Sequence, residues 1–141
     1  MDLKPWLTQY AVAALVFCVV DFVWLGTVAQ GLYDDRLGDL LADQPNLGAA
    51  VVFYAIFVAG LVFFVIHPAV ERASGLYAVL AGAFFGLVTY ATWDLTSLAV
   101  LEGFPASLVP IDLAWGTFLA ASVSVSTYAL VQVLPDWARG G

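Results

Sequence analysis

Charged side chains are scarce in this sequence. They make up only 11% of the 141 residues, whereas 63% of the residues are hydrophobic. A soluble domain of ordinary composition carries roughly a quarter charged residues. So few charges cannot cover a water-facing surface, and we expect the solvent of this chain to be largely lipid. The length suits one domain.

Cysteine and basic residues are scarcer still. Cys18 is the one cysteine, which excludes a disulfide framework or a cysteine-based metal site within one chain. Four Lys and Arg residues face 11 acidic ones, so the formal net charge is −7. This balance argues against nucleic acid as a partner, because phosphate binding needs a basic surface. It also argues against anionic lipid headgroups as partners.

Long hydrophobic runs are what the sequence has instead. A membrane-spanning helix needs about 20 mainly apolar residues. Four stretches qualify, at residues 6–29, 47–66, 74–99 and 108–134. The first does not resemble a cleaved signal peptide, since its apolar run continues through Asp21. The sequence predicts an all-α integral membrane four-helix bundle, with Pro68 just after the second span.

The few basic residues predict an orientation. With four spans, Lys4, Arg72 and Arg139 share one side of the membrane and Arg36 lies on the other. The positive-inside rule then places both termini in the cytoplasm. Eight of the acids fall in the outer half: Asp21, Asp34, Asp35, Asp39, Asp43, Asp94, Glu102 and Asp112.

Three of these acids lie inside predicted spans. A helical rise of 1.5 Å per residue puts Asp21 about 12 Å, Asp94 about 8 Å and Asp112 about 6 Å below the outer ends of their helices. Tyr54 lies at a similar depth. We therefore expect the three carboxyl groups to share one layer and one site, although up to 91 positions separate them in the sequence.

Small residues indicate which way two of these acids face. Gly82, Gly86, Tyr90 and Asp94 repeat at every fourth position of the third span. A second stripe begins at Asp112 and continues through Gly116, Ala120 and Ser124. Small residues at this spacing let membrane helices approach closely. Both acids should therefore point into the bundle, although such faces are equally compatible with contacts between copies of the chain.

Each acid also has a purely structural interpretation. Asp112 follows a proline in a first helical turn, where a carboxylate caps free N–H groups. Burying an ionised aspartate at the centre of a helix costs about 2.5–3.5 kcal/mol on insertion scales. Asp94 and Asp21 are therefore either functional or pinned by hydrogen bonds from neighbouring hydroxyl groups, with Tyr54, Tyr90, Thr92 and Thr96 as the candidates.

Few positive charges are available to balance the three acids of this layer. Arg36, in a loop, is the one candidate partner, so at least one acid is expected to be protonated, to share a proton or to bind something positive. A hard cation is chemically compatible with such oxygens, but no ligand spacing indicates one, and no metal or cofactor is predicted. Trp24, Trp93 and Trp115 belong either to the interfacial aromatic belt or to the lining of a ligand site. His67, at the inner end, is expected to be interfacial.

The first loop predicts a short helix on the outer surface. In "GLYDDRLGDLLADQPN", Tyr33, Leu37, Leu40 and Leu41 fall on one helical face and the charges largely on the other. Such a helix lies along an interface. Its acidic face disfavours anionic lipid, so we expect it to pack over the bundle as a lid. Gly31 and Gly38 would allow it to move.

The chain resembles a bacterial family of four-span predicted membrane proteins, the domain of unknown function 2177. The likeness rests on "DFVWLG", "LGDLLADQPN", "FYAIFVAGL", "HPA", "GAFFGLVTYATWDLTSLA" and "DLAWGT". It implies an integral inner-membrane protein whose signature positions are Asp21, Trp24, Tyr90, Asp94, Asp112, Trp115, Gly116 and Thr117. It implies no particular activity.

Three functions remain open at this point. The first is a site, in transport or binding, for a proton, a cation or a cationic amphipathic ligand, formed by Asp21, Trp24, Tyr54, Tyr90, Trp93, Asp94, Asp112 and Trp115. The second is a membrane enzyme that acts on lipid or isoprenoid, with one protonated acid as general acid and another as base. The third is a structural or accessory subunit whose acids only pin helices together.

Overall fold

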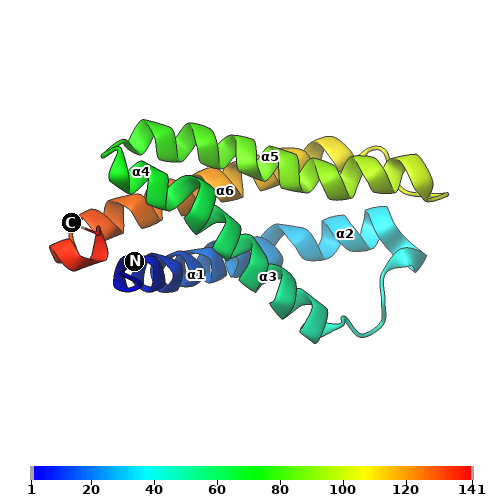
Figure 1. Ribbon diagram of the computed structural model, residues 1–141. Helices are drawn as coiled ribbons and strands as arrows, with labels where there is room; N and C mark the ends of the chain where they lie inside the picture. The colour runs from blue at the N-terminus through cyan, green and yellow to red at the C-terminus, as the bar shows by residue number, and fades with distance from the viewer. Residues whose placement is uncertain (1, 141) are drawn as a thin grey trace.

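The computed structural model describes residues 2–140, which form helices joined by short loops (Figure 1). Within this range no β-strand occurs, and four helices are long and apolar enough to cross a membrane. They are Lys4–Ala29, Leu47–Glu71, Gly75–Val100 and Leu108–Gln132. The predicted all-α membrane helical bundle is confirmed. Both termini lie at one end, here the termini end, and helix α2 lies at the other, here the α2 end.

The first span is longer and less regular than its sequence indicates. Helix α1 (Lys4–Trp24) passes into a π-helical turn, Leu25–Ala29, which passes directly into α2 (Gln30–Leu37). The predicted helix of the first loop is thus a continuation of the first span. It stops at Gly38, whose φ of +50° suits glycine and ends the helical geometry. Leu40 and Leu41, predicted on its apolar face, lie beyond this stop and are exposed.

The second span continues past Ile66, where the hydrophobic run predicted its end. Helix α3 (Leu47–Leu61) is followed by a π-helical turn, Val62–Ile66, and by α4 (His67–Glu71). Pro68 lies in the first turn of α4 and lacks the N–H that would bond to the carbonyl of Phe64. The Tyr77 hydroxyl donates to that carbonyl instead, at 3.3 Å. The helix therefore tolerates the proline.

Helices α5 (Gly75–Val100) and α6 (Leu108–Gln132) form the closest contact in the bundle. A Cβ atom added at Gly86 would lie 2.1 Å from the Gly116 carbonyl oxygen and 2.7 Å from the Ala120 Cβ. One added at Gly82 would lie 2.8 Å from the Ser124 hydroxyl. The two helices approach so closely only because these positions carry no side chain.

The apolar core lies in two parts. The main cluster fills the bundle between the four spans and includes Phe17, Leu61 and Leu119. A smaller cluster at the α2 end joins Phe104, Leu108 and Val109 to Leu32, Tyr33 and Leu37. This second cluster holds α2 against the start of α6, which fixes the position of Tyr33.

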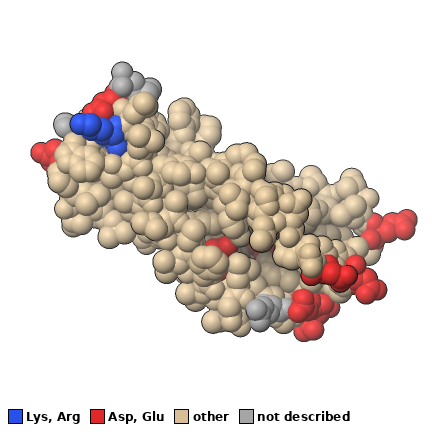
Figure 2. All heavy atoms as spheres, turned by 90° about the horizontal axis from the view of Figure 1, so that it is seen from below, with Lys and Arg blue, Asp and Glu red and all other residues tan. Residues whose placement is uncertain are grey.

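The outer surface is apolar along the middle of the bundle and charged at its ends. Figure 2 shows basic side chains at the termini end of one face and acidic side chains gathered at the α2 end. Large hydrophobic side chains on the spans, such as Leu15, Phe22 and Phe84, are 67–70% exposed. A surface of this kind suits lipid. A few acidic atoms are visible in the middle of the tan face.

Candidate functional site

Asp21 lies on the last turns of α1 and is 8% exposed. The Tyr54 hydroxyl of α3 donates a hydrogen bond to its Oδ2 at 2.8 Å. The Tyr54 ring is held by an edge-on contact with Phe17, at 5.0 Å between ring centroids. This bond therefore joins the first two spans and supplies one donor to a buried acid.

Asp112 has the same kind of partner from a different element. It is 4% exposed, and the Tyr33 hydroxyl of α2 donates to its Oδ1 at 2.6 Å. Burial, together with the neighbouring Asp112 carboxyl, raises the pKa of Tyr33, so its hydroxyl stays a donor. Asp112 does not cap α6, because the helix begins four residues earlier, at Leu108. The acid fastens α2 instead.

Asp94 is fully buried, and neither of its carboxyl oxygens accepts a hydrogen bond from the described residues. The hydroxyl groups of Thr92 and Thr96 donate to backbone carbonyls of their own helix. Across the α5–α6 contact, Gly82 faces Ser124, Gly86 faces Ala120 and Tyr90 faces Gly116. One helical turn further along α5, the same register places Asp94 opposite Asp112. Ionised carboxylates only accept hydrogen bonds. A bond between these two acids therefore requires that one of them carries a proton.

Tyr90 lies among the three acids. It precedes Asp94 by one turn of α5, and it lines one cavity with Asp112 and another with Asp21. Its ring covers Gly116, where an added Cβ would lie 2.2 Å from the Tyr90 Cγ. The absence of a side chain at Gly116 therefore admits this ring into the bundle.

That the three acids form one site, as their depth indicated, stays a prediction. Among residues 2–140, no group of three histidine, cysteine or acidic residues is arranged to hold a metal ion. Asp94 lies opposite Asp112 across the α5–α6 contact, whereas Asp21 accepts a hydrogen bond from Tyr54 of α3. Depth along a helix is readable from the sequence, but the rotation and tilt that set distances across the bundle depend on packing.

Two adjoining cavities lie beside these acids. The larger, of about 380 Å³, is lined by Tyr33, Phe53, Thr89, Tyr90, Trp93 and Asp112. The smaller, of about 280 Å³, is lined by Asp21, Trp24, Leu25, Tyr33, Ala50, Phe53, Tyr54, Tyr90 and Trp115. They share Tyr33, Phe53 and Tyr90, and their linings include no basic residue. Each cavity has one acid and several aromatic side chains.

The tryptophans occupy two settings. Trp24 and Trp115 stack with their ring centroids 4.1 Å apart and their planes at 9°, which joins α1 to α6 beside the smaller cavity. Each follows its aspartate by three positions, a spacing that places two side chains on one helical face. Trp93 lines the larger cavity, is 58% exposed and meets Phe104 edge to face.

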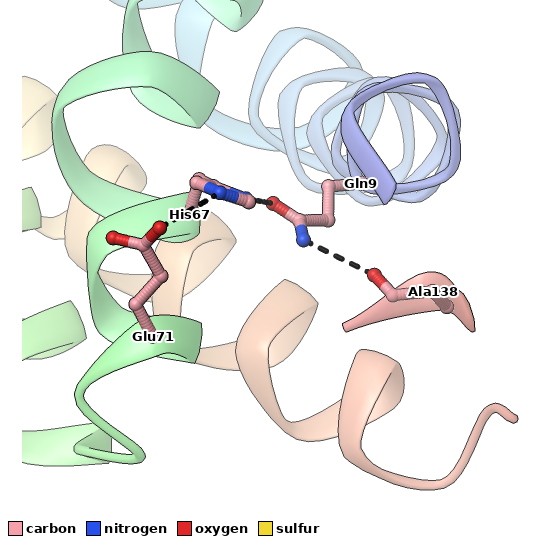
Figure 3. Close-up of polar contacts among 4 residues, drawn as sticks. All are labelled: Gln9, His67, Glu71 and Ala138. Carbon is pink, nitrogen blue, oxygen red and sulfur yellow. Dashed lines mark hydrogen bonds and ion pairs between the residues drawn. The ribbon is translucent and has the colours of Figure 1, made fainter. Parts of the chain in front are cut away.

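A second buried polar group lies at the termini end (Figure 3). The Gln9 amide of α1 donates to the Ala138 carbonyl at 3.1 Å, and its oxygen lies 3.0 Å from Nδ1 of His67. His67 Nε2 lies 3.3 Å from Glu71, and Trp6 stacks on the ring at 3.8 Å. We call Gln9, His67, Glu71 and the Ala138 carbonyl the termini cluster. The sequence predicted His67 at this end, but it did not predict a role for Gln9, the one amide within the first hydrophobic run up to residue 29.

Comparison with known proteins agrees with the helical architecture. The sequence profile described as "Predicted membrane protein (DUF2177)" matches residues 6–129. Searches among curated proteins and among solved structures gave no match.

Proposed function

The chain belongs to the DUF2177 family of predicted membrane proteins, and from that premise we propose that it binds a cationic amphipathic ligand at the α2 end. One observation carries the proposal. Buried acids open into adjoining cavities whose linings are otherwise mainly aromatic and include no basic residue.

The larger cavity suits the head of such a ligand. Small-molecule pockets span about 300–1,000 Å³ and combine an apolar lining with a few polar groups, and this cavity, at about 380 Å³, lies within that range. Asp112 supplies the anionic group. Aromatic side chains around it favour a cation, because their ring faces attract positive charge.

The ligand's tail would leave toward lipid between α3 and α5. Phe53 on α3 and Trp93 on α5 line the larger cavity and are 48% and 58% exposed. The two helices diverge toward the α2 end (Figure 1). A ligand could therefore enter from the side, with its hydrocarbon tail still in the bilayer.

In this proposal the α2 end faces the outside of a bacterial inner membrane. The charges support it, since Lys4, Arg72 and Arg139 belong to the termini end and only Arg36 to the α2 end. The ligand would then reach the site from the outer leaflet.

The test compares two probes with the same tail. The protein, in nanodiscs of zwitterionic lipid, is titrated with dodecyltrimethylammonium and with a neutral dodecyl glycoside, and calorimetry reports the affinities. We expect the cationic probe to bind at least tenfold more tightly. Asp112→Asn should remove this preference, whereas Asp39→Asn, an exposed acid outside both cavities, should retain it. Equal affinities for the two probes in the unmodified protein would refute the proposal.

A second function is favoured by one specific observation, the position of Asp94 opposite Asp112 next to an opening toward lipid. A protonated and an ionised carboxyl group side by side are the groups that general acid–base chemistry on a lipid or isoprenoid needs. Mass-spectrometric comparison of the lipids of a deletion strain and its parent tests this alternative. An unaltered lipid profile would count against it.

A further inference from the structure

Asp94 is the least explained side chain of the candidate site. It is fully buried, and its two oxygens accept no hydrogen bond from the described residues. A buried ionised carboxylate with no donor is costly, and proteins generally avoid it. The absence of a donor is resolved if a proton lies between Asp94 and Asp112, since a protonated carboxyl group is itself a donor.

The neighbouring groups leave one place for this proton. Tyr33 already donates to Oδ1 of Asp112, and Tyr54 to Asp21. The titratable groups around the pair are Tyr33 from α2, Tyr90 from α5, Asp21 from α1 and Tyr54 from α3. None of these is basic. The space between Asp94 and Asp112, which lie opposite each other, is therefore where a single proton satisfies two buried acceptors at once.

We infer that Asp94 and Asp112 share one proton, and that a cation entering the larger cavity displaces it. The inference rests on the proposed function and adds its mechanism. Asp112 both lies opposite Asp94 and lines the larger cavity. A cationic head beside Asp112 repels the shared proton and replaces its charge, so one positive charge enters and one proton leaves. The site would thus exchange a proton for a cation.

The proton itself is tested first, without any ligand. Infrared spectroscopy of protein carrying ¹³C-labelled aspartate identifies a protonated carboxyl group by its isotope-shifted C=O band. We expect this band at neutral pH in the unmodified protein and in Asp39→Asn, and we expect it to be absent in Asp94→Asn. A missing band in the unmodified protein, or a band that persists in Asp94→Asn, would overturn the inference.

Displacement is tested with dodecyltrimethylammonium in weakly buffered solution. One proton released per probe bound is expected, with an affinity that rises up to tenfold per pH unit while the pair still holds its proton. Asp94→Asn should bind the probe without releasing a proton. Binding without release in the unmodified protein would overturn the exchange and leave the proposed function standing. No binding at all would overturn both.

Discussion

Two buried polar regions, the termini cluster and the three acids at the α2 end, differ in their balance of hydrogen-bond donors and acceptors. At the termini end, the Gln9 amide donates to a carbonyl, and because that fixes its orientation, its oxygen must accept from His67. The remaining ring nitrogen faces Glu71. Each of these buried groups has a partner from a different element of the chain.

The α2 end has more acceptors than donors. Three buried carboxyl groups receive two tyrosine donors, and Asp94 receives neither. Buried polar groups in folded proteins are normally hydrogen-bonded. Burial of polar groups alone therefore does not indicate function in this bundle. Gln9 and Nδ1 of His67 are paired with each other and suit a structural role, whereas Asp94 keeps unused capacity to accept a proton or a cation.

The largest loss of stability is expected for a substitution that disrupts packing beside the acids and leaves the termini cluster intact. In Gly116→Ala, the new methyl group would overlap the Tyr90 ring, and overpacking of this kind costs about 1–3 kcal/mol. We expect a value near the upper limit, because the overlap is with the ring's Cγ atom and not its mobile edge. Unfolding in detergent measures it. Gly26→Ala is the control, since nothing lies within 4 Å of its added Cβ; equal losses in both variants would contradict the prediction.

A change at Gln9 should destabilise the termini cluster. Gln9→Leu leaves the His67 Nδ1–H and the Ala138 carbonyl without partners, and an unsatisfied buried group costs about 1–3 kcal/mol. We expect a loss of about 2 kcal/mol with unchanged binding of the cationic probe. Tyr10→Phe, which removes an exposed bond between α1 and α3, should cost less. A lower probe affinity in Gln9→Leu would show that the two regions are coupled.

The sequence predicted more of the acid site at the α2 end than of the termini cluster. The four spans followed from the hydrophobic runs, and the predicted depths of Asp21, Asp94 and Asp112 from helical rise. The partners did not, because Tyr33 and Asp112 lie 79 positions apart and meet only through a π-helical turn that no sequence pattern marked.

The termini cluster was missed for a similar reason. Gln9 and Ala138 are 129 positions apart, and their contact depends on how the C-terminal segment returns to α1. A lone amide within an apolar run was the one signal for it in the sequence.

Loss of the Tyr33 hydroxyl should have an intermediate effect, confined to one helix. Tyr33→Phe removes the bond to Asp112, at a cost of about 1–2 kcal/mol. The ring remains packed, so we expect faster amide hydrogen exchange in α2 and little change in α5. Tyr54→Phe removes the matching bond to Asp21 and should leave exchange in α2 unchanged. Protection in α2 that is unaltered in Tyr33→Phe would contradict its role as a fastening.

The smallest effect on stability is expected for a change at Asp94, and it distinguishes the two buried polar regions most clearly. Asp94→Asn should change the free energy of unfolding by less than about 1 kcal/mol, because the amide can donate to Asp112 without a shared proton. Gln9→Leu and Asp94→Asn would then differ in stability although both positions are fully buried. A loss above about 2 kcal/mol in Asp94→Asn would indicate that the acid already has a donor.

The π-helical turn at Leu25–Ala29 has a geometric consequence for α2. Such a turn holds one more residue than an α-helical turn, and each residue of an α-helix corresponds to a rotation of about 100°. If the same residues formed an uninterrupted α-helix, the face that carries Tyr33 would point about a quarter of a circle away from its present direction, and so away from Asp112. The register of this helix relative to the acids is thus set by one inserted residue, eight or fewer positions before the tyrosine.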